Sequence, residues 1–161
     1  AACDSIDLVY SSGEMNRGNL FLTCVAALKG DKGLKAIKSR NVTKIVSMGV
    51  DLREEQPTLK DNILFVAVDD TVDAMEKLAK NLQKAYNFIH QEISNPKGGS
   101  VIVHCRQGIS RSASVIVFYL MQRYSITAAM ALERIKRARP KAEPNKGFFK
   151  KLQALDPKEI N

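Results

Sequence analysis

The sequence predicts an α/β fold, with a central, mostly parallel twisted sheet flanked by helices. Short β-rich runs alternate with segments of helical periodicity along the chain. The run 63–68, ILFVAV, is continuously apolar, as expected of a strand that is buried on both faces of a sheet. A further apolar run, 101–103, passes through a polar turn directly into an apolar helical segment. The fold class therefore follows from the order of the elements and from the apolar character of the strands.

Length and composition are those of one globular domain, which we expect to span residues 1–161. The chain is 45% hydrophobic and 26% charged, which is ordinary for a soluble protein. No apolar run approaches the ~20 residues of a membrane span, and the first residues lack the pattern of a secretory signal. The cysteines Cys3, Cys24 and Cys105 show no zinc-like spacing. We therefore expect a structural role for Cys3 and Cys24, and a cytoplasmic or nuclear protein with no membrane span.

The first half of the chain is expected to form four strands and one helix. Strands are predicted at 6–10 and 18–23, a helix at 30–40, and further strands at 42–48 and 62–68. Asp69 and Asp70 come directly after the last of these strands. In open α/β sheets ligands bind at the carboxyl edge of the strands, so these two acids are placed where a site is expected.

The second half is expected to be mostly helical. Asp73 is predicted to cap the first helix, with Glu76 completing a capping box. One face of this helix is apolar and is interpreted as core: Met75, Leu78, Leu82, Tyr86, Ile89 and Ile93. Residues 112–123 are apolar nearly all round, which indicates a buried helix. Thr127 is predicted to cap a helix at 128–139, and Asn145 to start a last helix that carries Phe148, Phe149, Leu152 and Leu155.

The segment 100–114, SVIVHCRQGISRSAS, reads as strand, tight turn and helix start. A helix N-terminus presents amide groups without internal partners, and its dipole favours an anion. Gly108 lets the backbone curl so that successive amides point inward. Arg111 supplies a planar fork for two phosphate oxygens, and these groups together stabilise a thiolate at Cys105. A nucleophile and an anion cradle thus meet at one point, which suits transfer of a phosphoryl group to sulfur.

The alternative interpretation is a buried, inert cysteine at a strand end, since a free cysteine is often part of a core. That interpretation does not explain why arginine, glycine and two serines crowd the same turn after Cys105. We therefore favour the chemical interpretation of the segment.

The string His104-Cys105-x5-Arg111-Ser112 resembles the signature of cysteine-dependent protein phosphatases. The fuller pattern HCxxGxSRS is most similar to the dual-specificity branch, in a small, atypical form without a kinase-docking module. The similarity runs from about residue 20 through the IVSMG strand to the closing RP…PN…GFFKKL segment. It implies that Cys105 is the nucleophile and that Arg111 clamps the phosphate. It also implies that the Ser112 hydroxyl bonds the sulfur and helps it leave, and that His104 braces the loop. The phosphate-binding loop would be formed by Arg106, Gln107, Gly108, Ile109, Ser110 and Arg111.

The resemblance also implies a general acid, because the family takes an aspartate from a loop some thirty residues before the cysteine. Asp70, followed by Thr71, matches the family pattern best, and Asp69 is the alternative. The simpler interpretation is that both are turn or cap residues. No metal or other cofactor is implied, because Arg111 and the loop amides neutralise the phosphoryl charge.

The implied activity is hydrolysis of phosphotyrosine and phosphoserine or phosphothreonine in proteins through a phosphocysteine intermediate. Arg106 and Gln107, however, replace the small residues common in members that act on proteins. A cation at the first of these positions occurs in members that act on phosphoinositides or other highly charged phosphates, whereas the simpler interpretation, which we favour for this residue alone, is that Arg106 points to solvent. A phosphatase for non-protein phosphates, such as a phosphoinositide or an RNA 5′-phosphate, is therefore the second hypothesis. A phosphate-binding module without catalysis is the third.

The net charge is +8, and many of the basic residues lie late in the chain. They are Arg134, Lys136, Arg137, Arg139, Lys141, Lys146, Lys150 and Lys151. We favour the interpretation that they form the solvated faces of two amphipathic helices. The alternative is a surface that attracts acidic or polyphosphorylated ligands, phospholipid headgroups or nucleic acid.

Overall fold

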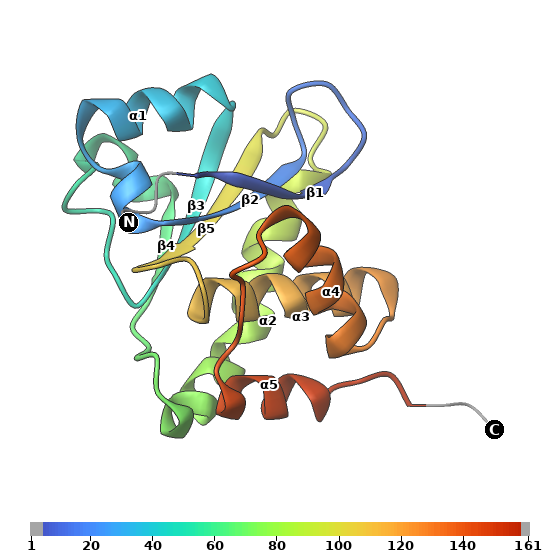
Figure 1. Cartoon of the computed structure of the whole chain (residues 1–161). Helices are drawn as coiled ribbons and strands as arrows, with labels where there is room; N and C mark the ends of the chain where they lie inside the picture. The colour runs from blue at the N-terminus through green and yellow to red at the C-terminus, as the bar shows by residue number, and fades with distance from the viewer. Residues whose placement is uncertain (1–4, 159–161) are drawn as a thin grey trace.

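A five-stranded sheet forms the centre of the computed structural model, which describes residues 5–158 (Figure 1). The strands are β1 (Asp7–Ser11), β2 (Asn19–Cys24), β3 (Val42–Met48), β4 (Ile63–Val66) and β5 (Ser100–Cys105). Their order across the sheet is β1-β2-β5-β3-β4. β1 runs antiparallel to β2, and the other neighbouring strands are parallel. The predicted mostly parallel sheet is confirmed, with β5 at its centre.

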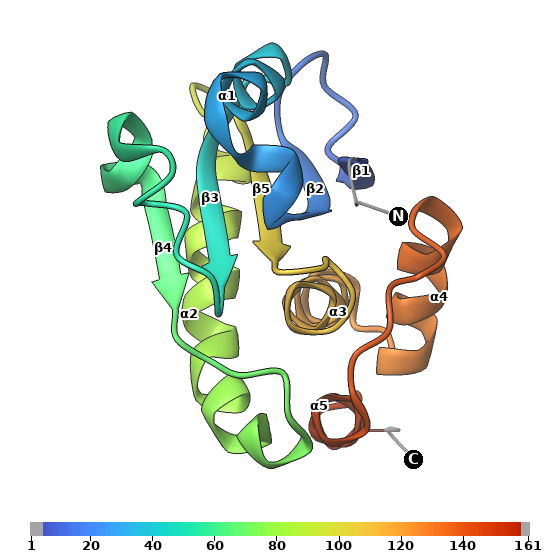
Figure 2. The same cartoon turned by 60° about the vertical axis from the view of Figure 1, so that its left-hand side comes forward.

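Helices cover both faces of the sheet (Figure 2). They are α1 (Gly30–Ser39), α2 (Met75–Ser94), α3 (Arg111–Tyr124), α4 (Ala128–Ala138) and α5 (Lys146–Gln153), with short 3₁₀ helices η1 (Val25–Leu28), η2 (Pro57–Asn62) and η3 (Val72–Ala74). α1 lies on one face and α2 and α3 on the other, with α4 and α5 packed outside α3. In the described part of the chain, no single helix is long and apolar enough to cross a membrane, and α3 and α4 reach that length only together, across a bend of 119°.

The alternation of side chains along β5 divides the core between these two layers. Val101, Val103 and Cys105 belong to the larger core, on the side of α2 and α3, whereas Ile102 belongs to the smaller core beside α1. Because both faces of β5 are covered, all six of its residues are buried. The carboxyl end of β5 therefore delivers Cys105 to the middle of the sheet edge, at the start of α3.

One of the two predicted helix caps, Thr127, is confirmed, and Asn145, which was predicted only to start the last helix, also caps it. The Thr127 hydroxyl accepts a hydrogen bond from Met130 N at 3.2 Å, and Asn145 Oδ1 accepts one from Phe148 N at 2.9 Å. The capping box at Asp73 is wrong. Asp73 lies inside the 3₁₀ turn η3, and α2 begins after Ala74 without a side-chain cap. A capping residue needs an extended backbone, which a turn residue does not have.

Two predicted boundaries are also shorter in the structure. The strand predicted at 62–68 is formed only by β4. Val68 N bonds to Val66 O at 3.1 Å, which turns the chain out of the sheet before the two acids. The last helix ends at Gln153, so that Leu155 lies beyond it and is 51% exposed.

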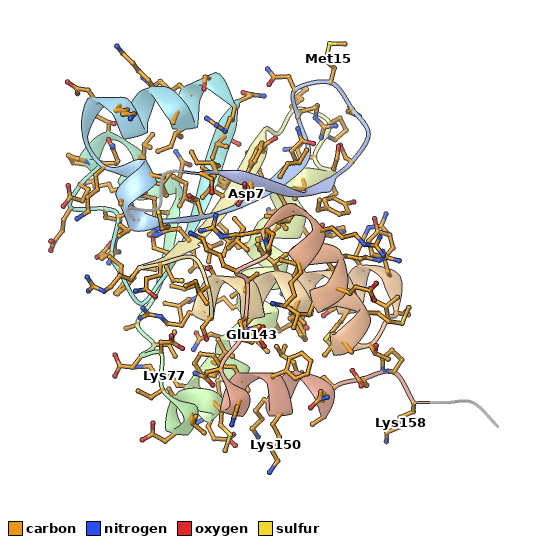
Figure 3. All side chains as sticks on the ribbon, viewed as in Figure 1. Asp7, Met15, Lys77, Glu143, Lys150 and Lys158 are labelled. Atoms are coloured by element: carbon orange, nitrogen blue, oxygen red, sulfur yellow. The ribbon has the colours of Figure 1, made fainter. Side chains whose placement is uncertain are left out.

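The late basic residues mostly form solvated helix faces, as favoured from the sequence. Ion pairs join Lys136 to Glu143, Arg137 to Glu133 and Lys151 to Glu76. Lys150 and Lys158 point outward from the molecule (Figure 3). Arg139 is the exception, because its side chain is 1% exposed. Placing Arg139 on a solvated face was wrong, since the chain after α4 turns this guanidinium into the interior.

Candidate active site

The Cys105 thiol lies at the junction of β5 and α3, where three predicted site residues meet. Its Sγ accepts a hydrogen bond from Gly108 N at 3.2 Å and lies 3.0 Å from Ser112 Oγ. Cys105 is a free cysteine and is 3% exposed, and Ser112 is fully buried. The Gly108 amide donates to the sulfur, and the Ser112 hydroxyl is placed to donate to it when the sulfur is a thiolate.

The loop between Cys105 and α3 is shaped by hydrogen bonds to its carbonyl groups. The donors come from outside the loop or from the first turn of α3: Val25 N to Arg106 O (3.3 Å), Glu143 N to Ile109 O (2.7 Å), and Ser114 N and Oγ to Ser110 O (2.9 and 2.8 Å). In a trans peptide the carbonyl and the next N–H point in opposite directions. Carbonyls that point outward therefore leave amides pointing inward, which supports the predicted anion cradle.

Arg111 is held in place by one side of its guanidinium. Its Nη1 donates to Val68 O at 3.0 Å. It also packs on Gly49, where a Cβ would lie 2.0 Å from Nη1 and where φ is +80°. Arg111 Nε is buried and has no hydrogen-bond partner among the described residues. A phosphate oxygen is the kind of acceptor that such a buried donor requires, which supports the role expected of Arg111.

His104 precedes Cys105 on β5, so its side chain points to the opposite face of the sheet, where it holds the end of the strand. It is fully buried, with Nε2 2.5 Å from the hydroxyl of Ser47 on β3 and Nδ1 3.4 Å from the Cys105 carbonyl oxygen. Burial lowers the pKa of His104 to about 4, so the ring is neutral at physiological pH. The contact supports the bracing role expected of His104. Sequence reasoning missed Ser47, because only the pairing of β3 with β5 brings it opposite His104.

Asp70 and the signature loop line one cavity of about 150 Å³. The lining residues are Asp70, Cys105, Arg106, Gln107, Ile109, Ser110 and Arg111. Asp69 is not among them, although both acids are exposed. The cavity therefore supports Asp70 over Asp69 as the acid that faces the nucleophile.

Asn145 links the acid to the loop. Its Nδ2 donates to Asp70 Oδ1 at 3.0 Å, and its backbone N donates to Ser110 Oγ at 2.9 Å. From the sequence, Asn145 was only the start of the last helix. Its contact with Asp70 spans 75 residues of chain, and no local pattern predicts such a contact.

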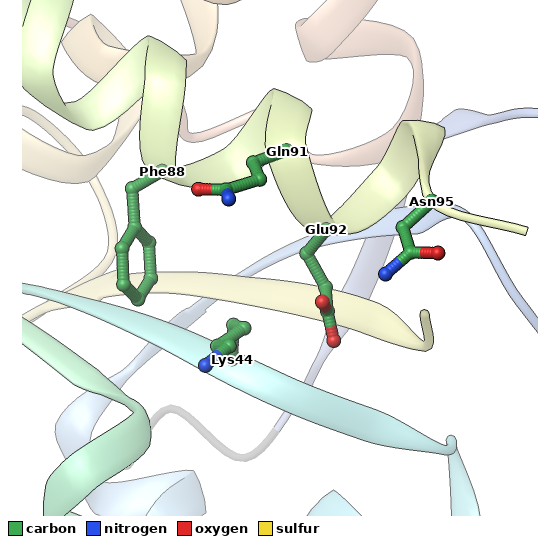
Figure 4. Close-up of a pocket in the computed structure, with 5 residues that line it drawn as sticks. All are labelled: Lys44, Phe88, Gln91, Glu92 and Asn95. Carbon is green, nitrogen blue, oxygen red and sulfur yellow. The ribbon is translucent and has the colours of Figure 1, made fainter. Parts of the chain in front are cut away.

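A hollow of about 220 Å³ lies away from this site, between α2 and β3 (Figure 4). It is lined by Lys44, Phe88, Gln91, Glu92 and Asn95. Lys44 already donates to Asn62 Oδ1 at 2.8 Å, and the Glu92 carboxylate accepts a hydrogen bond from the Thr43 hydroxyl. None of the lining residues is a cysteine or an arginine, so this hollow does not offer the chemistry of the Cys105 cavity.

Cys24 lies in the core and is not one of the residues that line the cavity at Cys105. Cys24 ends β2 in register with Cys105 and is 1% exposed, so its side chain is part of the core. Cys3 lies outside the described residues. Over residues 5–158, no group of three or more His, Cys, Asp or Glu side chains is placed to hold a metal ion.

Comparison with known sequences gives the same family throughout. The family model for the dual specificity phosphatase catalytic domain matches residues 27–157. Dual specificity protein phosphatase 1 of Arabidopsis thaliana is 36% identical over 85% of this chain and 65% of its own length. Dual specificity protein phosphatase 1B of the same plant is 32% identical over 74% of this chain and 69% of its own. The chain thus spans about two thirds of the length of these two relatives, and 55% of a probable dual specificity phosphatase of Dictyostelium discoideum.

Solved structures show the same similarity in three dimensions. Human DUSP28 superimposes with a TM-score of 0.76 at 30% identity, covering 94% of this chain and 92% of that one. DUSP15 superimposes with a TM-score of 0.72 at 32% identity, covering 85% and 82% respectively. The sheet, the helices around it and the strand-to-helix loop at Cys105 are therefore those of a known fold.

Proposed function

The chain belongs to the dual specificity phosphatase family, and on that premise we propose that it hydrolyses phosphotyrosine and phosphoserine or phosphothreonine in proteins. The observation that carries this proposal is the surrounding of the Cys105 sulfur. Gly108 N and Ser112 Oγ lie within 3.2 Å of it, and Arg111 begins the helix behind the same loop. This geometry favours a thiolate and a bound phosphate at one point.

In the first step, Cys105 Sγ attacks phosphorus and the ester P–O bond breaks. Asp70 gives its proton to the departing serine, threonine or tyrosine oxygen, which leaves as a neutral alcohol or phenol. The inward amides and the Arg111 guanidinium hold the oxygens of the transferring phosphoryl group. The products are the dephosphorylated substrate, a phosphocysteine and an ionised Asp70.

In the second step, a water molecule attacks the phosphocysteine. The ionised Asp70 takes one proton from this water as its oxygen bonds to phosphorus, and the P–S bond breaks. The electron pair of that bond returns to Cys105 as a thiolate, which Ser112 Oγ stabilises as a donor at 3.0 Å. Inorganic phosphate is released, and Asp70 is again protonated for the next cycle.

The decisive test is turnover of an aryl phosphate and of phosphopeptides by the parent chain and by Cys105→Ser. We expect the substitution to abolish turnover, because a neutral hydroxyl replaces the thiolate, and to preserve binding of a phosphopeptide. A chain that binds phosphopeptides but never turns them over would instead be the phosphate-binding module.

Arg106 favours a second candidate function. Its side chain is exposed and lines the cavity, which adds a cation beside the phosphate-binding loop. A phosphatase for phosphoinositides or RNA 5′-phosphates would use this charge. Parallel assays of phosphopeptides, inositol lipids and a 5′-phosphorylated RNA compare the two functions. In the Arg106→Ala variant only the non-protein activity is expected to fall if the second candidate is right.

We also propose a cytoplasmic or nuclear location, because the reaction needs Cys105 as a thiol. In cells lysed in an alkylating reagent, Cys105 is expected to be alkylated as a free thiol. An oxidised Cys105 in that extract would contradict a reducing compartment.

A further inference from the structure

We propose that Asp7 and Arg139 form a positioning pair that holds the phosphate-binding loop in its anion-binding shape. The inference rests on the proposed function, since it concerns the same loop. It adds a residue of the first strand and a residue after α4 to a site built from β5 and α3. Neither residue touches the cavity, so both act through the backbone of the loop.

Arg139 binds the two loop carbonyls that the other donors leave. Its Nε donates to Gly108 O at 2.8 Å, and its Nη2 donates to Gln107 O at 3.2 Å. With these oxygens held outward, the N–H groups of Gly108 and Ile109 point toward the cradle. The hydrogen bond of 3.2 Å from Gly108 N to Cys105 Sγ shows this direction. One guanidinium thus fixes two consecutive peptide groups of the cradle.

The close approach of Arg139 also explains the glycine in the middle of the loop. Gly108 has a φ of +68°, and a Cβ on it would lie 2.6 Å from both Arg139 Nη2 and Thr23 O. A side chain here would push the guanidinium off the carbonyls. Gly108 therefore serves the contact with Arg139 as well as the curl of the backbone.

Asp7 supplies the opposite charge that a buried guanidinium needs. Its Oδ2 accepts from Arg139 Nη1 at 2.7 Å, and Arg139 is 1% exposed. A charge this deep is stable only when it is paired and hydrogen-bonded. Asp7 lies on β1 (Figure 3) and outside residues 27–157, which the family model matches. The first strand thus contributes a carboxylate to the support of the loop.

The planar guanidinium of Arg139 donates hydrogen bonds in several fixed directions at once. Nε and Nη2 bond to the loop while Nη1 bonds to Asp7, so one rigid group spans both sides. A lysine is a point charge on a flexible chain and does not reproduce three fixed directions. Arg139→Lys therefore separates the positioning role from charge alone.

The experiment measures the rate of Cys105 alkylation by iodoacetamide against pH, protection of Cys105 by inorganic phosphate, and kcat/KM for an aryl phosphate. In Arg139→Met we expect the midpoint of the alkylation profile to rise by about one pH unit and phosphate protection to weaken about tenfold. kcat/KM is expected to fall about tenfold or more, because the inward amides are no longer fixed. Arg139→Lys and Asp7→Ala are expected to shift all three readouts in the same direction by less.

Two variants control for stability and for charge. Ile135→Ala removes a fully buried side chain from α4, the helix that precedes Arg139, and lowers the melting temperature without removing a loop contact. Glu14→Ala removes a carboxylate that pairs with Arg17 in the neighbouring β1–β2 turn. Below their melting temperatures, both controls should keep the parental alkylation midpoint. Asp7→Asn, which keeps an oxygen acceptor, serves if Asp7→Ala does not fold.

The double variant Asp7→Ala/Arg139→Met tests whether the pair acts as a unit. If Asp7 works through Arg139, the double variant is no worse than Arg139→Met alone. Additive losses, or a parental alkylation midpoint in the folded Arg139 variants, would overturn the inference. Alkylation and phosphate protection need no turnover. A parent chain without phosphatase activity whose midpoint still responds to Arg139 therefore refutes the proposed function and leaves the positioning pair standing.

Discussion

The phosphate-binding loop and the acid-bearing segment face the same cavity but are built in opposite ways. The loop carries buried residues, among them Cys105 and Gly108, and its carbonyls are bonded by donors from η1, α3 and the segment after α4. Residues 69–73 are all exposed, and the hydrogen bond from Asn145 Nδ2 to Asp70 Oδ1 ties the acid to the loop side of the cavity. The loop is thus fixed from several sides, whereas the acid is fixed mainly from one.

The difference fits the role proposed for each region. Charge stabilisation depends on dipoles that already point at the phosphoryl oxygens, so the loop amides must not reorient during the reaction. Proton transfer depends on one carboxyl group that meets first the leaving oxygen and then an incoming water. A buried acid would exclude that water. Burial therefore suits the cradle, and exposure suits Asp70.

The largest expected effect comes from changing the exposed acid, Asp70. In Asp70→Asn we expect kcat to fall about 10²- to 10³-fold with a serine phosphopeptide, because the poor leaving group then departs without a proton. With an aryl phosphate, whose leaving group is good, the loss should be much smaller. The measurement is the pH–rate profile with both substrates, in which the basic limb should disappear.

Asp69→Asn is the matched control, because it makes the same chemical change one residue away. Asp69 does not line the cavity, so its profile should follow that of the parent. If Asp69→Asn loses the basic limb and Asp70→Asn retains it, the assignment of the acid is reversed.

The second effect concerns the buried His104, and the quantity that changes is the free energy of unfolding. The unfolded chain takes up a proton on His104 below about pH 6.5, whereas the folded chain does so only below about pH 4. The unfolding free energy should therefore decrease as the pH falls between these values, by about 3 kcal/mol in total from this group. Urea unfolding at several pH values in this range measures it.

His104→Gln provides the reference for that experiment, because it removes the titrating ring from the strand end. The variant should be less stable near neutral pH and should lose stability less steeply on acidification. An equally steep decrease in the parent and in His104→Gln would show that burial of His104 is not its cause.

The smallest effect concerns the connection between the two regions. Asn145→Asp keeps an oxygen to cap α5 but replaces the donor to Asp70 with a second carboxylate. We expect kcat for a serine phosphopeptide to fall about fivefold to tenfold, with little change in melting temperature. Steady-state kinetics and thermal unfolding measure the two quantities.

Thr127→Ala is the control for the capping role, since it removes the cap of α4 and touches neither Asp70 nor Ser110. It should lower stability and leave kcat unchanged. In an Asp70→Asn background, Asn145→Asp should cause no further loss. A further loss there would mean that Asn145 acts on catalysis by another route.

The sequence predicted the elements that depend on local pattern. The apolar runs, the turn chemistry and the string from His104 to Ser112 identified the parallel sheet, the buried α3 and the signature loop, because each is written in neighbouring residues. The cap at Thr127 and the start of the last helix at Asn145 followed for the same reason. The prediction of a capping box at Asp73 was wrong because a 3₁₀ turn precedes α2, and no local sequence pattern distinguishes that turn from the start of the helix.

The tertiary structure alone decided which distant groups support the site. Arg139 has the same local setting as its basic neighbours, and only the turn after α4 sends it to the loop carbonyls and to Asp7. Ser47 reaches His104 through strand pairing, and Asn145 reaches Asp70 through the packing of α5. The sequence by itself determined the strand-to-helix loop after Cys105 and the order of the elements, because those rest on near neighbours. The long-range partners depend on how the layers pack, which is set by the burial of many side chains at once.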